Sequence, residues 1–215
     1  GICGQIRFDG KDVTSESLDN MMLKLAKRGP DSSGQWTAQR IGFGHQRLSI
    51  IDLSSYGSQP MVDNKLELTL VFNGTIYNYK SLRSQLLKKG YHFFSNSDTE
   101  VIIKAYHFWG ENCLEHLDGM FAFAIWDHST KKLFVARDRM GIKPLYFNST
   151  SKAFTFASNS QALLTQEIDR SINPVALQQQ LSLHGVVPAP NTIINGIQKL
   201  KPGSYMILNS GGQIE

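Results

Sequence analysis

An apolar run meets an Asn-Gly pair in the segment Leu68-Thr69-Leu70-Val71-Phe72-Asn73-Gly74-Thr75-Ile76-Tyr77-Asn78. Its apolar first half predicts a buried strand over 66–72, and Asn73-Gly74 predicts that this strand ends in a turn. Because an Asn-Gly pair tolerates positive φ, we expect the turn to direct backbone N–H groups outward. A two-residue hairpin is disfavoured, since residues 77–80 lead into a helix. A side-chain amide and a free backbone N–H at a strand end are suited to stabilise an oxyanion.

The period of the apolar residues predicts the other strands and helices. The expected strands cover residues 2–8, 41–45, 66–72, 120–126, 133–137, 144–147, 153–158 and 204–208. The expected helices cover residues 15–27, 79–89, 98–109, 159–164 and 174–183. Ser15 is the expected N-cap of the first helix, and Ser97 or Asp98 that of the third. Residues 28–34 are rich in turn formers and are expected to form a loop.

The order of these elements predicts an α+β fold. Strands occur in antiparallel-looking runs with helices in blocks between them, unlike the strict alternation of parallel βαβ units. The run Phe121-Ala122-Phe123-Ala124-Ile125-Trp126 is apolar on both faces, so this strand needs packed layers above and below it. Two sheets between two helix layers satisfy that requirement. A chain of 215 residues fits one large domain or two small ones.

Composition and charge argue against several classes of protein. The net charge is +4, but the Lys and Arg residues are scattered, which disfavours a nucleic-acid surface. No apolar run approaches the ~18 residues of a membrane span, and no secretory signal opens the chain. The two cysteines, Cys3 and Cys113, have no zinc-site or disulfide-framework spacing. We therefore expect a cytoplasmic protein that binds neither nucleic acid nor membrane and holds no metal.

A series of short motifs runs through nearly the whole chain in a fixed order. They are Gly1-Ile2-Cys3-Gly4, Arg28-Gly29-Pro30-Asp31, His45-Gln46-Arg47-Leu48-Ser49-Ile50-Ile51-Asp52, Phe72-Asn73-Gly74, Ile76-Tyr77-Asn78, Ser97-Asp98-Thr99-Glu100, Gly119-Met120-Phe121-Ala122-Phe123-Ala124, and Ala136-Arg137-Asp138-Arg139-Met140-Gly141-Ile142-Lys143-Pro144-Leu145-Tyr146. Together they resemble the glutaminase domain of class II glutamine amidotransferases of the asparagine synthetase type. No single motif is decisive, but the whole set in this order is specific.

The resemblance implies a four-layer αββα fold of the N-terminal-nucleophile type and hydrolysis of glutamine to glutamate and ammonia. Residues 1–215 would be the glutaminase domain, for which no cofactor is expected. The ammonia would pass to a downstream synthetase domain, absent from this chain, that uses ATP and Mg²⁺. The ammonia acceptor stays unnamed, with aspartate as the default. The oligomeric state is open, a homodimer included.

The family's pattern at the N-terminus is Cys-Gly-Ile-x-Gly, with the cysteine as nucleophile. Gly1-Ile2-Cys3-Gly4 matches its last four positions, so this register places the nucleophile immediately before Gly1. The α-amine of such a cysteine has an ordinary pKa of about 8 and can accept the thiol proton. The alternative is trimming that makes Cys3 the first residue and the nucleophile. Side chains alternate along a strand, so the two candidates lie on opposite faces, and we favour the cysteine before Gly1.

The resemblance also assigns residues to the two charged ends of the substrate. The guanidinium fork of Arg47 suits the α-carboxylate of glutamine, since it offers two hydrogen bonds at once. Leu48 and Ile50 follow in the same motif and are expected to contact the substrate. Asp98 would receive the α-ammonium, although an aspartate at a helix start is also a common N-cap.

Asn73 and Gly74 would form the oxyanion hole through the side-chain amide and the backbone N–H, and Thr75 would contact the substrate beside them. Thr75 and Asn159 depart from the family, which usually has Glu at both positions. These departures keep a second interpretation open, in which the chain is a non-catalytic glutamine-binding or assembly module. A third interpretation is a self-processed amidase that uses Cys3.

Overall fold

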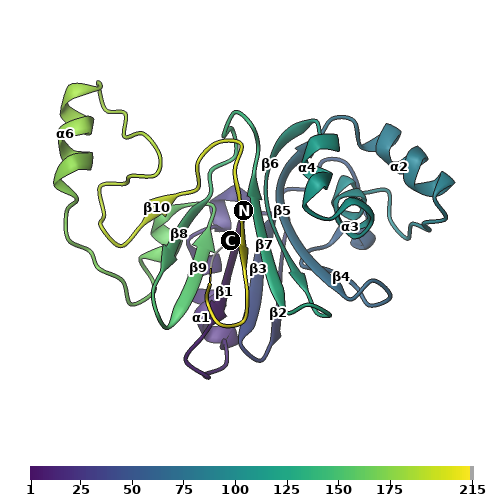
Figure 1. The fold of residues 1–215 in the computed structure, drawn as a ribbon, viewed down its shortest axis with the longest axis horizontal. Coiled ribbons are helices and arrows are strands. Elements are labelled where there is room, and N and C mark those ends of the chain that lie inside the picture. The colour runs from purple at the N-terminus through teal and green to yellow at the C-terminus, as the bar shows by residue number, and fades with distance from the viewer. Residues whose placement is uncertain (214–215) are drawn as a thin grey trace.

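The computed structural model describes residues 1–213 and contains two antiparallel sheets packed face to face (Figure 1). The six-stranded sheet has the order β10 (Gln198–Lys199), β8 (Tyr146–Ser149), β9 (Ala153–Ala157), β1 (Ile2–Arg7), β3 (Ile41–Arg47), β2 (Ser32–Ala38). The five-stranded sheet has the order β11 (Tyr205–Leu208), β7 (Lys132–Arg137), β6 (Gly119–Asp127), β5 (Leu68–Ile76), β4 (Met61–Asp63).

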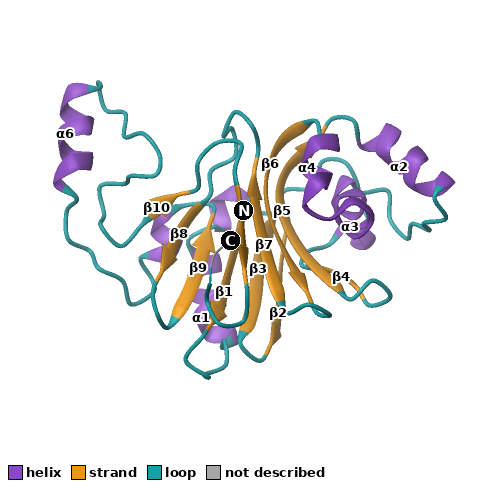
Figure 2. Ribbon diagram, viewed as in Figure 1, coloured by secondary structure: helices purple, strands orange, loops and turns teal. Residues whose placement is uncertain are grey.

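Helices cover the outer faces of both sheets (Figure 2). On the six-stranded sheet these are α1 (Ser15–Leu23) and α5 (Ser160–Leu163). On the five-stranded sheet they are α2 (Tyr79–Lys88), α3 (Asp98–Trp109) and α4 (Cys113–His116). A further helix, α6 (Pro174–Ser182), projects away from the sandwich. The predicted α+β fold with four αββα layers is therefore confirmed.

Three apolar clusters fill the spaces between the four layers. The cluster between the sheets includes Ile2, Phe43 and Val71, whereas Phe72 faces the helices that cover the second sheet. Cys3 belongs to the third cluster, under α1. Neighbouring residues on β1 and on β5 thus point to opposite faces, as the pleat of a strand requires. This alternation decides which side chains can enter a site between the sheets.

The predicted turn at Asn73 and Gly74 is wrong. Strand β5 continues to Ile76, and Asn73 and Gly74 pair with Ala122 and Phe121 of β6. Pairing with a long neighbouring strand overrides the local preference of Asn-Gly for a turn, since strand propensity depends strongly on context. The expectation that no hairpin forms here is confirmed, because α2 follows.

Other boundaries differ from the prediction in smaller ways. The expected loop over 28–34 gives way to β2 at Ser32, and the short strands β4 and β10 were not predicted. The first helix ends at Leu23 and its N-cap is Thr14, whose side chain accepts from the Ser17 N–H. Ser97 caps α3, as one of the two expected residues. None of the helices within residues 1–213 is long and apolar enough to cross a membrane.

Candidate active site

A cavity of about 350 Å³ opens where the beginning of β1, the end of β3 and the last half of β5 meet. The residues predicted to bind substrate all line it, and Gly1 lies there with them: Arg47, Leu48, Ile50, Asn73, Gly74, Thr75 and Asp98. Leu48 and Ile50 belong to the rim, since 56% and 69% of their surfaces are exposed. Segments far apart in the sequence therefore supply one site.

The first residue of the chain is buried in cationic surroundings. The Gly1 amino group donates to the Gln46 carbonyl over 2.6 Å. Burial, followed by the charge of Arg28, lowers the pKa of this amino group from 8.0 to about 5. Lys143 acts in the same direction, and both cations line the cavity. Burial and these two cations therefore favour the neutral form of an amine in this place.

A loop after β3 fixes the guanidinium of Arg47. Its Nη1 donates to the Ser54 carbonyl over 3.0 Å, and its Nη2 donates to the Asp52 carbonyl. Gly57 gives the group room, because a Cβ there would lie 2.5 Å from Nη2. A guanidinium carries five N–H donors, so others are left for a ligand in the cavity. The structure thus holds a pre-positioned cation at the site.

The open edge of β5 provides a backbone donor. The Phe72 N–H donates to Gln59 Oε1 over 2.6 Å, and the Ile76 N–H donates to Asp98 Oδ2 over 3.0 Å. Because N–H groups of alternate residues point to the same edge of a strand, the N–H of Gly74 points to this edge too. Strand β4 pairs with residues 68–70 only, so it ends before Gly74. Gly74 therefore offers the expected free N–H, from a strand edge rather than from a turn.

Two buried polar side-chain atoms in residues 1–213 have no hydrogen-bond partner, and both belong to residues that line this cavity. They are Asn73 Nδ2 and His45 Nδ1. Leaving such a group unsatisfied costs about 1–3 kcal/mol, so native structures retain few of them. Their concentration at one cavity indicates a place built to bind a polar ligand.

Asp98 is buried at the first turn of α3, on the same cavity. Burial raises the pKa of its carboxyl group, and the hydrogen bond from the Ile76 N–H opposes this shift. The N-cap role belongs to Ser97, whose hydroxyl accepts from the Thr99 N–H over 3.0 Å. The alternative that Asp98 is the N-cap is therefore wrong. Its carboxylate joins the start of α3 to the end of β5.

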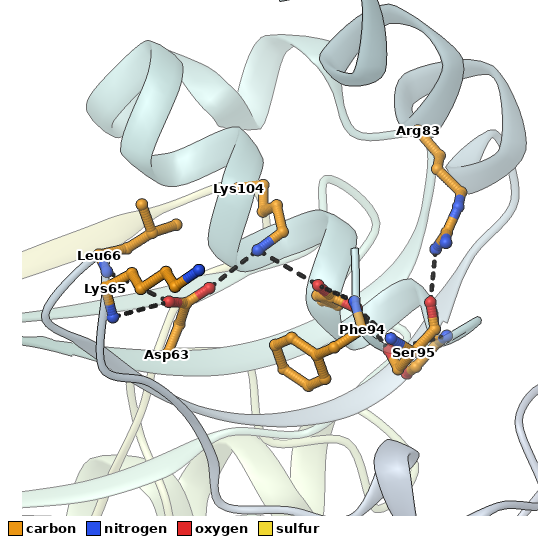
Figure 3. A network of polar contacts seen from close by, with 9 residues as sticks. Asp63, Lys65, Leu66, Arg83, Phe94, Ser95 and Lys104 are labelled. Carbon is orange, nitrogen blue, oxygen red and sulfur yellow. Dashed lines mark hydrogen bonds and ion pairs between the residues drawn. The ribbon is translucent and has the colours of Figure 1, made fainter. Parts of the chain in front are cut away.

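A buried polar network holds the segment that leads to Asp98 (Figure 3). Glu100 accepts from the N–H groups of Phe94 and Ser95 and from the Ser95 hydroxyl. Lys104 lies between two acids, 3.2 Å from Glu100 and 2.8 Å from Asp63. These contacts tie α3 to β4 and to the loop before the helix, and so fix the position of Asp98.

Three residues outside the predicted substrate-binding set also have clear positions, and the first agrees with the favoured nucleophile before Gly1. Cys3 is fully buried on the opposite face of β1 and does not line the cavity, and burial raises the pKa of its thiol to about 12. Asn159 also lies outside the cavity, where it caps α5 by accepting from the Ala162 N–H. His45 was missed as a site residue. The sequence does indicate its direction. His45 follows Ile41 and Phe43 at intervals of two residues, so all three side chains lie on the same face of the strand.

Comparison with known proteins places this chain in a family. A model of the family described as "Glutamine amidotransferase domain" matches residues 1–215. The chain belongs to this family. "Asparagine synthetase [glutamine-hydrolyzing] 1" of Bacillus subtilis is 40% identical to this glutamine amidotransferase domain over 219 residues, which cover 99% of the chain and 34% of the relative.

The chain is also similar to other curated relatives, and it shares its fold with a solved structure. A putative glutamine-hydrolysing asparagine synthetase of Mycobacterium tuberculosis is 41% identical over 95% of the chain. Amidase chry2 of Gibberella zeae is 35% identical over 93% of the chain. The chain spans about a third of the length of these relatives. The glutamine phosphoribosylpyrophosphate amidotransferase of Bacillus subtilis has the same fold, with a TM-score of 0.71 at 20% identity over the whole chain and 48% of that protein.

Proposed function

We propose that this domain hydrolyses glutamine to glutamate and ammonia, using a cysteine immediately before Gly1 as nucleophile. The observation that carries the proposal is the single cavity shared by Gly1, Arg47, Asn73 and Asp98. It brings together the beginning of the chain, a cation, an unpartnered amide donor and a buried acid. Glutamine needs these four features: a nucleophile for its side-chain amide, an oxyanion site, and partners for its two charged ends.

The register of β1 supports a nucleophile before Gly1 rather than Cys3. Ile2 points between the sheets and Cys3 points under α1. A residue before Gly1 continues the face of Ile2, which is the face of the cavity. Its α-amine would take the thiol proton in surroundings that lower the pKa of an amine.

The chemistry then follows from the groups that line the cavity. The thiolate attacks the side-chain carbonyl carbon of glutamine, and Asn73 Nδ2 and the Gly74 N–H donate to the oxyanion that forms. When the intermediate collapses, the C–N bond breaks and the leaving nitrogen takes a proton from the amine, which releases ammonia. Water then attacks the γ-glutamyl thioester, which yields glutamate and restores the thiol. Arg47 binds the α-carboxylate and Asp98 binds the α-ammonium.

We further propose that the ammonia passes to a synthetase domain of the full-length protein that uses ATP and Mg²⁺, as in an asparagine synthetase-like enzyme. The relatives that support this are about three times longer than the chain. Aspartate is the default acceptor. The cofactors belong to the synthetase domain, and residues 1–215 would require none for glutamine hydrolysis.

The test is a glutaminase assay of the full-length protein. Release of glutamate and ammonia from glutamine in a 1:1 ratio supports the proposal. Replacement of the cysteine before Gly1 by alanine should abolish the release, whereas Cys3→Ala should leave it unchanged. Full activity after the first replacement would refute the assigned nucleophile. A protein that binds glutamine without hydrolysing it would instead be the non-catalytic module.

A further inference from the structure

We propose that His45 is a specificity-determining residue that accepts a hydrogen bond from the N–H of the substrate's side-chain amide and so distinguishes glutamine from its acid and ester analogues. This inference rests on the proposed glutaminase function. It concerns a residue that has no role in the steps given above. The observations that carry it are the position, burial and hydrogen bonding of the imidazole.

His45 lies where it can reach the reacting amide. It is the inward-facing residue of β3 between Phe43 and Arg47, and it stands opposite Ile2 of β1. It lines the cavity, and only 4% of its surface is exposed. The ring also contacts the backbone of Phe72, the residue before Asn73. The imidazole therefore lies next to the strand that supplies the oxyanion donors.

The contacts of the His45 ring indicate which of its two nitrogens carries the proton. The Phe72 N–H already donates to Gln59, so the backbone group of Phe72 that meets the ring is its carbonyl. Nδ1 has no partner within residues 1–213, so we assign the contact with Phe72, and with it the ring proton, to Nε2. Nδ1 then holds a lone pair and acts as an acceptor. Burial is the main cause that lowers the pKa of His45, to about 3, and the charge of Arg47 acts in the same direction, so the ring is neutral.

The two unpartnered atoms at the cavity are complementary to a carboxamide. Asn73 Nδ2 is a donor and His45 Nδ1 is an acceptor. A primary amide presents an acceptor oxygen and a donor N–H, which match this pair. A carboxylate or an ester presents acceptors only, so one of them would face the lone pair of Nδ1. A site built to hydrogen-bond an N–H strongly rejects an analogue that lacks it. The pair thus favours glutamine over the product glutamate.

The experiment compares two substrates of the full-length protein, glutamine and γ-methyl glutamate. Both give the same γ-glutamyl thioester, so kcat/KM isolates the acylation step in which they differ. In His45→Phe the ratio of kcat/KM for amide over ester should fall about tenfold, the effect of one neutral hydrogen bond. His45→Gln retains an acceptor and should keep the ratio near that of the wild type. His116→Phe, a stacked histidine outside the cavity, is the matched control and should also keep it.

The kinetics of the His45 variants distinguish the acceptor role from its alternatives. An unchanged ratio in His45→Phe, with both substrates slowed equally, would overturn the inference and assign His45 to the nucleophile or to stability. An equal fall of the ratio in His45→Gln would also count against the acceptor role. If His45→Phe does not fold, His45→Ala is measured with the same two substrates. A wild-type protein that hydrolyses neither substrate refutes the proposed function itself, which is a distinguishable failure.

Discussion

Gly1 and Gln46 exchange two backbone hydrogen bonds, with the Gly1 nitrogen donating over 2.6 Å and the Gln46 N–H donating over 2.8 Å. This pair fixes the register at the beginning of β1. Ile2 stands opposite His45, so a residue before Gly1 would stand opposite Arg47.

Asn73→Ala should lower the catalytic rate without lowering the stability of the fold. Removing one oxyanion donor lowers kcat about 100- to 1,000-fold. The free energy of unfolding should change little, because Asn73 Nδ2 makes no hydrogen bond in the structure. Steady-state glutaminase kinetics and urea denaturation of the same variant check both halves. Unchanged kcat would remove Asn73 from the oxyanion hole.

The matched control is another asparagine, Asn159. Its side chain caps α5 and donates to the Lys24 carbonyl, outside the cavity. Asn159→Ala should therefore cost about 1 kcal/mol of stability, the usual effect of losing an N-cap, and leave kcat unchanged. A loss of activity equal to that of Asn73→Ala would show that the departure from Glu at this position matters for turnover.

Arg47→Lys should raise the KM for glutamine at least tenfold and lower kcat less. A lysine cannot form two parallel hydrogen bonds to a carboxylate, and it cannot also hold the carbonyls of Asp52 and Ser54. Arg7→Lys, at the far end of β1, is the control and should change neither constant. Wild-type kinetics in Arg47→Lys would reject Arg47 as the carboxylate partner.

The acid limb of the pH profile should lie well below pH 8. The amine at Gly1 has its pKa lowered to about 5, chiefly by burial and then by Arg28. We expect an amine one residue earlier to be affected by the same cations and therefore to stay an unprotonated base at pH 7. Arg28→Gln removes one of these charges and should shift the acid midpoint of kcat/KM upward. A midpoint that stays fixed, or that moves downward, would contradict this assignment.

Lys104→Met should destabilise the domain by about 3–5 kcal/mol, because it leaves Asp63 and Glu100 buried without their cation. Lys152→Met, on an exposed turn, is the control and should stay within about 0.5 kcal/mol of the wild type. Denaturant unfolding measures both variants. Equal stability of the two variants would show that the network contributes nothing to the fold.

Much of the fold followed from sequence periodicity. The strand predicted over residues 120–126 is apolar on both faces, which indicated packed layers on both sides of its sheet. In the structure this strand, β6, lies in the centre of the five-stranded sheet. Short edge strands such as β4 carry too few residues for a period to be visible. The Asn73-Gly74 turn failed because a nine-residue partner strand outweighs a dipeptide preference. Local sequence does not contain that partner.

The site was predicted less completely than the fold. Motif order identified Arg47, Asn73 and Asp98, which the structure brings to one cavity. The free N–H of Gly74 arises because Gln59 and Asp98 occupy its neighbours along the edge, which needs the tertiary structure. The role of His45 could not be predicted from the sequence either, because only the packed structure shows that its Nδ1 has no hydrogen-bond partner.

The most direct test of the central claim is covalent labelling of the mature full-length protein with diazo-oxo-norleucine, followed by peptide mass analysis. We expect one adduct, on a cysteine immediately before Gly1, and protection from labelling by glutamine. An adduct on Cys3, or a glutamine-hydrolysing protein with no cysteine before Gly1, would contradict it.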